Sequence, residues 1–155
     1  MSVPTLVQIC DAIETTLSEA TGLTHSQAYD ELTEAMVDLP MLQVYPEDWT
    51  MDIGGGSTDR TTFGAGVRQS GYTIYADLYA RQRGAGIDEE MGALVPLIDA
   101  LITVFREQRT KPYFALEGLQ AFGPVTFRRV IFNYGDPQVG YIGARFTIPV
   151  RIYGT

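Results

Sequence analysis

The stretch from Gly140 to Gly154 alternates between two kinds of side chain over its whole length. Its even positions are apolar: Ile142, Ala144, Phe146, Ile148, Val150 and Ile152. Most of its odd positions are polar, small or amphipathic: Tyr141, Gly143, Arg145, Thr147, Arg151 and Tyr153. This period of two predicts a β-strand with one buried face. Pro149 cannot donate a ladder hydrogen bond, which predicts that the strand lies at a sheet edge for part of its length.

A second long strand and two main helices are predicted upstream. The apolar stripe that begins at Leu6 predicts a helix over residues 5–20, and an alternation like that of the last strand predicts a strand over 67–83. A second apolar stripe, from Leu94 to Phe105, predicts another helix. Because proline disrupts a helix interior, Pro96 indicates a short first turn capped by Asp88 and then a main helix from near Val95.

Weaker patterns are interpreted as shorter elements. These are a helix over 26–37, a strand over 41–49, a short strand over 113–116 and a strand over 125–134. The adjacent charges Arg128 and Arg129 interrupt the alternation of the last of these, which predicts a bulge. A turn over 133–138 then returns the chain antiparallel.

These elements predict an α+β fold, with two main helices packed on one face of an antiparallel β-sheet. A chain of 155 residues fits a single domain over 1–155. The single cysteine, Cys10, rules out an internal disulfide. No run of 18 apolar residues and no signal peptide are evident, so we expect no membrane partner and a location in the cytoplasm or in an assembly built there.

The charge of the chain is divided unevenly along its length. Residues 1–59 carry 11 acidic side chains and no Lys or Arg, whereas residues 60–155 carry eight acidic side chains and 11 Lys or Arg. One interpretation is a solvated acidic surface. The other is a polarised module whose opposite faces meet neighbours of opposite charge. Both argue against tight DNA binding through the first third of the chain.

No catalytic, metal or cofactor motif is found in the sequence. His25 is the only histidine, so a histidine-based triad or metal site is not expected. The run Gly54-Gly55-Gly56 lacks the lysine and the context of a phosphate-binding loop. We therefore expect no enzymatic activity and no cofactor. An RNA-binding sheet would also use aromatic residues and arginine, but the net charge of −8 disfavours it.

Contact residues are expected on the sheet and on a long flexible Gly-rich loop over 51–66. Alternation predicts that Tyr75 and Tyr79 share one strand face with Asp77 and Arg81, and that Tyr141 and Tyr153 share another with Arg145 and Arg151. Interfaces are enriched in tyrosine and arginine, and apolar residues on a flexible loop often have a partner chain. A half-solvated antiparallel face would also tolerate tyrosine and arginine. The candidate contacts between subunits or with a neighbouring ring are Ile53, Gly54, Gly55, Gly56, Arg60, Phe63, Tyr75, Tyr79, Arg81, Arg145, Arg151 and Tyr153.

The layout of the chain resembles a known family over nearly its whole length. The quoted segments are the helix Val7-Gln-Ile-Cys-Asp-Ala-Ile13, the strand end Val44-Tyr45-Pro46, the Gly-rich loop, the helix Leu97-Ile-Asp-Ala-Leu101 and the strand Phe146-Thr-Ile-Pro-Val-Arg-Ile152. In this order they resemble the tail terminator and tail-completion proteins of tailed bacteriophages. The likeness lies in layout and weak patterns.

The resemblance implies a structural virion protein. Members of that family form rings, usually hexamers, that cap the tail tube and join it to the head. The implied partners are further copies of the chain, the tail tube protein and a head-completion or connector protein, with genomic DNA passing through the ring. Another neck or tail-tube subunit is an alternative. So is a different class, a small-ligand-binding α+β domain or minor enzyme.

Overall fold

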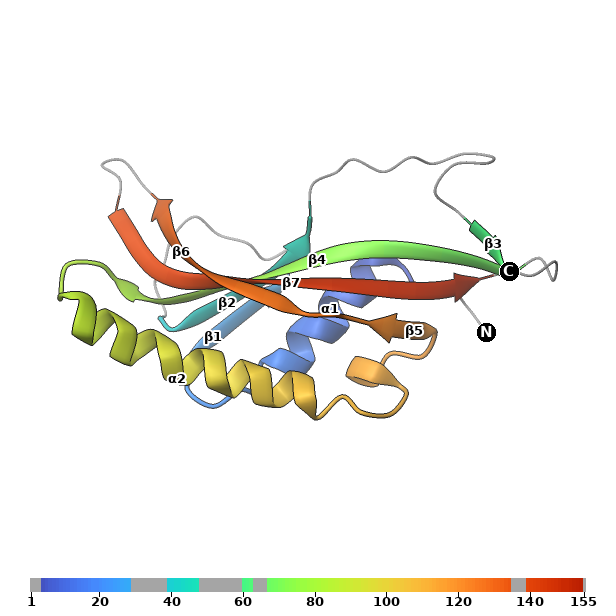
Figure 1. The fold of residues 1–155 in the computed structure, drawn as a ribbon, viewed down its shortest axis with the longest axis horizontal. Helices are drawn as coiled ribbons and strands as arrows, with labels where there is room; N and C mark the ends of the chain where they lie inside the picture. Colours follow the sequence, from blue (N-terminus) through green and yellow to red (C-terminus); the bar gives the residue numbers. More distant parts are fainter. Residues whose placement is uncertain (1–3, 29–38, 48–59, 63–66, 135–138, 155) are drawn as a thin grey trace.

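The computed structural model describes residues 4–28, 39–47, 60–62, 67–134 and 139–154 (Figure 1). It confirms the predicted α+β fold. The elements, in chain order, are α1 (Leu6–Leu17), β1 (His25–Ala28), β2 (Met41–Pro46), β3 (Arg60–Thr62), β4 (Val67–Gln82), α2 (Ile87–Arg106), the 3₁₀ turn η2 (Tyr113–Ala115), β5 (Leu119–Phe122), β6 (Thr126–Tyr134) and β7 (Val139–Gly154).

One sheet contains all seven strands. Its main order is β1-β2-β4-β7-β5; β3 pairs with the first part of β4, and β6 pairs with β7. All described strand pairs are antiparallel except β1 and β2, which run parallel. The long strands β4 and β7 pair along nearly their whole lengths and form the middle of the sheet (Figure 1).

The position of β7 corrects the prediction that Pro149 marks a sheet edge. β7 is flanked by β4 on one side and by β6 and then β5 on the other. The carbonyl of Pro149 accepts from Gly123 N at 2.8 Å, where the chain passes from β5 to β6. The nitrogen of Pro149, which carries no hydrogen, points to the same side of the strand. It lies between the part of β7 that pairs with β6 and the part that pairs with β5, so no ladder hydrogen bond is lost there.

Both helices pack on the same face of the sheet, as predicted. Thr5 and Gln8 form a capping box at the start of α1. Ile9, Ile13 and Leu17 of α1 are fully buried in one cluster with Leu97 and Leu101 of α2. That cluster also holds the even-numbered side chains of β4 and β7: Ile74, Ala76, Leu78, Ala80, Ile142, Ala144, Phe146, Ile148, Val150 and Ile152.

Helix α2 is continuous, which corrects the prediction of two pieces. It begins at Ile87 after Gly86 as N-cap, rather than at a cap formed by Asp88. Pro96 lies inside the helix on its exposed side, and Gly92, one turn earlier, is exposed too. The carbonyl that loses its intrahelical donor therefore faces water.

Three shorter elements also differ from prediction. Residues 25–28 form a strand that pairs with β2, where a helix was expected from residue 26. Residues 113–115 form a 3₁₀ turn, and the short strand follows at 119–122. Residues 60–62, expected within a flexible loop, pair with 67–69. In each case pairing with a neighbouring strand, or a local turn, outweighs a weak local pattern.

The predicted bulge lies on a different strand. β6 pairs with β7 without a register shift through Arg128 and Arg129. Those two arginines and their apolar neighbours Phe127 and Ile131 are all exposed, because β6 has no described strand on its outer side. Register shifts lie instead in β4, between Tyr79 and Arg81, and in β5, between Leu119 and Ala121.

Candidate interaction face of the sheet

The odd-numbered residues of β2, of β4 from Gly71 to Tyr79, and of β7 up to Arg151 lie on the face of the sheet turned away from the helices. The register places Asp77 opposite Gln43 on one side and opposite Arg145 on the other, and Tyr45 opposite Tyr75. These side chains therefore meet because three strands of alternating pattern are in register, although they are up to 102 positions apart.

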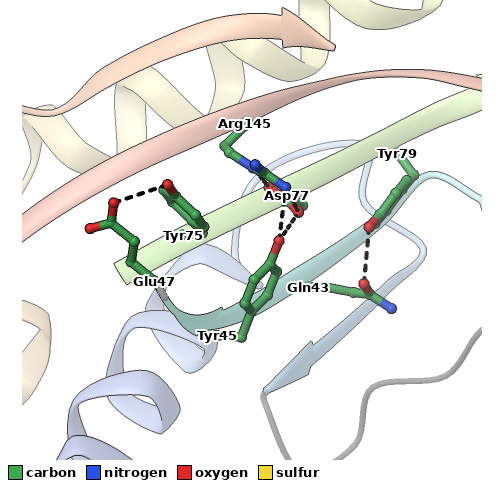
Figure 2. Close-up of polar contacts among 7 residues, drawn as sticks. All are labelled: Gln43, Tyr45, Glu47, Tyr75, Asp77, Tyr79 and Arg145. Carbon is green, nitrogen blue, oxygen red and sulfur yellow. Dashed lines mark hydrogen bonds and ion pairs between the residues drawn. The ribbon is translucent and has the colours of Figure 1, made fainter. Parts of the chain in front are cut away.

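Arg145, Asp77 and Tyr45 form a closed hydrogen-bonded group (Figure 2). Arg145 Nε and Nη2 donate to the two oxygens of Asp77 at 2.8 and 3.0 Å, and Nη2 also donates to Tyr45 Oη at 3.0 Å. The Tyr45 hydroxyl in turn donates to Asp77 Oδ2. The Asp77 side chain is only 2% exposed and that of Arg145 25%, so a largely dehydrated carboxylate is held by a bidentate guanidinium.

Tyr75 lies directly beside this group. The Arg145 guanidinium carbon lies 4.5 Å from the centre of the Tyr75 ring, and the rings of Tyr45 and Tyr75 meet edge to face at 5.9 Å. The Tyr75 hydroxyl donates to Glu47 Oε1 at 3.1 Å. Partial burial and then this bond raise the pKa of Tyr75 above its usual value. The hydrogen bond to Asp77 is the main cause that raises the pKa of Arg145.

Tyr79 forms a second, drier part of the same face. Its side chain is fully buried, donates to Gln43 Oε1 at 3.0 Å and packs on the Phe132 ring at 4.4 Å. Gly143 lies opposite Tyr79. A Cβ on Gly143 would come within 1.9 Å of the Leu78 carbonyl oxygen and 2.8 Å of Phe132, so only glycine fits.

The chemistry of this face favours binding over bond breaking. Across the described residues, every buried side-chain nitrogen or oxygen has a hydrogen-bond partner. The carboxylate of Asp77 already forms an ion pair with Arg145 and accepts a hydrogen bond from Tyr45. In the described part of the chain, no group of three or more histidine, cysteine, aspartate or glutamate side chains could hold a metal ion. What remains accessible is a rigid patch of half-buried tyrosine and arginine.

The structure brings together three of the twelve predicted contact residues. Tyr75, Tyr79 and Arg145 share this face, with Tyr79 buried beneath the accessible surface. Arg151 is exposed on the same face, further along β7. The backbones of Arg60 and Tyr153 lie in β3 and β7. Five predicted contacts lie outside the described residues: Ile53, Gly54, Gly55, Gly56 and Phe63.

Arg81 does not share the face of Tyr75 and Tyr79, which corrects the prediction. The bulge at Ala80 shifts the register, so Arg81 pairs with Ile142 and turns to the helix side. There it meets Glu89 of α2 at 3.5 Å. One inserted residue is enough to move every later side chain of a strand to the other face.

Sequence reasoning placed Asp77 on the face of Tyr75 and Tyr79 but named four members of the group nowhere among the contact residues: Gln43, Tyr45, Glu47 and Asp77. The first three alternate along residues 43–47, which is the spacing of one strand face. Asp77 lies between Tyr75 and Tyr79 at that same spacing. The signal was present in each strand, but the partner of each residue depends on strand order.

No protein-family model matches this chain, and no curated protein matches it either. Among the described residues, neither helix combines the length and the apolar character needed to span a bilayer.

Proposed function

We propose that this protein is a structural, non-enzymatic ring subunit of the tail-terminator type, which caps a phage tail tube and joins it to the head-neck connector. The proposal rests on the resemblance in layout and on the α+β fold. The observation that carries it is the rigid tyrosine and arginine face of the sheet, on which Tyr75 and Arg145 lie accessible beside the buried Asp77.

This face has the properties of a docking surface. Tyrosine and arginine are the residues that most often dominate binding energy at interfaces. The bonds of Arg145 to Asp77 and of Tyr75 to Glu47 already fix both side chains. A partner would therefore lose little side-chain entropy on binding them.

The charge distribution supports passage of DNA without tight binding. Asp11 is exposed on α1, in a third of the chain that carries no Lys or Arg. An acidic surface repels the phosphate backbone. In a ring, such a surface suits a channel through which DNA slides.

Particles that lack this protein provide the test. Adding the purified wild-type protein back should restore joining of heads to tails, scored by electron microscopy. Tyr75→Ala should restore it at least ten times less well, because it removes an accessible anchor. Val95→Ala, on the exposed side of α2, is the matched control and should act like wild type. Wild-type protein that fails to restore joining contradicts the proposal.

A further inference from the structure

An open apolar groove lies between the end of α2 and the edge strand β6. Its volume is about 310 Å³, and its lining is Ile102, Phe105, Arg106, Val125, Phe127 and Phe146. The Phe127 ring stacks on the Phe146 ring at 5.2 Å yet remains 48% exposed, and Ile131 is 43% exposed. Among the described strands, β6 pairs with β7 alone, so its outer edge is open. An edge strand with exposed apolar residues is a site for association.

Positive charge borders this groove. Arg106 lines it, and Arg129 of β6 is exposed two residues beyond Phe127, on the same face of the strand. Arg129 Nη1 donates to Met91 Sδ of α2 at 3.7 Å. We call Arg106, Arg129, Phe127 and Ile131 the basic edge.

The other flank of α2 carries the opposite charge. A second open groove, of about 360 Å³, lies between the end of α1 and α2. Three of its lining residues are acidic and exposed, namely Glu19, Asp99 and Glu107. Its remaining lining includes the small or apolar Ala20, Pro96, Ala100 and Val104. We call this the acidic groove.

We propose that the basic edge of one copy binds the acidic groove of a second copy of this chain. Arg106 and Arg129 would meet Glu19, Asp99 and Glu107, and Phe127 would enter the apolar part between Ala20 and Ala100. The inference rests on the proposed ring function and assigns the interface that builds the ring.

The two surfaces differ, which sets the symmetry. A contact between unlike patches is head-to-tail, and it closes into a ring when the rotation between copies allows. A two-fold contact of basic edge with basic edge would oppose like charges, and so would acidic groove with acidic groove. Charge therefore favours the ring-forming arrangement over a simple dimer.

Charge-swapped variants of the full chain test this contact. Arg106→Glu with Arg129→Glu makes both surfaces acidic; Glu19→Lys with Asp99→Lys makes both basic. Each double variant should weaken self-association by a factor of about 100 or more, measured by light scattering during gel filtration. The two variants mixed, or all four changes in one chain, should regain the wild-type mass. Arg109→Glu with Lys111→Glu is the matched control, because both residues are exposed and line neither groove.

The outcomes separate this inference from the proposed function. If the double variants keep the wild-type mass, or if mixing fails to restore it, the interface is elsewhere and the inference is wrong. If wild-type protein is monomeric at every concentration, the inference is also wrong. The proposed function is judged separately by the joining of heads to tails.

Discussion

The guanidinium of Arg145 and the carboxylate of Asp77 face each other across β7 and β4, with Nε–Oδ1 at 2.8 Å and Nη2–Oδ2 at 3.0 Å. The pair joins the two longest strands on the face turned away from the helices. Because Asp77 is almost fully buried, removal of Arg145 would leave its carboxylate without a counter-charge. The same pair positions Tyr45 and Tyr75, so stability and the shape of the candidate face are coupled.

Arg145→Ala should destabilise the fold by about 3 kcal/mol or more, because it leaves a buried carboxylate without its counter-charge. Urea unfolding followed by circular dichroism measures the change. The double variant Asp77→Leu with Arg145→Met is the control and should be closer to wild type than Arg145→Ala is. Equal stability of Arg145→Ala and wild type would show that the pair contributes nothing.

Gly143→Ala should cost about 1–3 kcal/mol of stability, the usual cost of overpacking. The added Cβ would lie 1.9 Å from a backbone oxygen, Leu78 O, which cannot rotate away as a side chain can. Gly92→Ala is the matched control, because an added Cβ there meets no atom within 4 Å and the helix gains propensity. Thermal unfolding of the two variants checks this. If the two variants have the same melting temperature, the close approach at Gly143 does not affect stability.

Much of the fold could be predicted from the sequence because its strongest patterns are long. The period of two over β4 and β7, and the stripes of α1 and α2, each repeat often enough to outweigh single exceptions. Short elements were predicted poorly. The four residues of β1 carry little pattern of their own, and their conformation follows from pairing with β2.

The candidate site was predicted less completely than the fold. Alternation placed Tyr75, Tyr79 and Arg145 on sheet faces, but it could not show that Asp77 lies opposite Arg145, which depends on register. No proline or glycine marks the bulge at Ala80. The sequence therefore does not predict that Arg81 lies on the helix side of the sheet. Pro149 predicted a sheet edge, whereas in the structure it lies where the partner of β7 changes from β6 to β5.

Stability should fall as the pH rises from about 9 toward 12. Burial raises the pKa of the Cys10 thiol from 9.0 to about 12, and the charge of Asp11 adds to this effect. Over this interval the folded state keeps the thiol proton and the unfolded chain loses it, so unfolding is favoured as pH rises. Cys10→Ala should show a shallower fall in urea unfolding between pH 8 and 10.5. The same slope in both proteins would contradict this assignment.

Deleting Gly54 to Ser57 should leave folding intact but weaken docking to tail tubes. The sequence predicts a flexible glycine-rich connection here, and such segments tolerate shortening while contributing contacts. Thermal unfolding checks the first part and co-sedimentation with tail tubes the second. Replacing Gly54, Gly55 and Gly56 with serine keeps the length and serves as the control. If the deletion variant docks as well as wild type, this loop is not part of the interface.

The mass of the particle that the purified protein forms, alone and with tail tubes, tests the central claim most directly. Analytical ultracentrifugation should show a closed oligomer, most simply six copies of the 155-residue chain, that moves with the tubes when they are present. A protein that stays monomeric in both conditions and leaves tube length unchanged would contradict the claim that it is a ring-forming tail terminator.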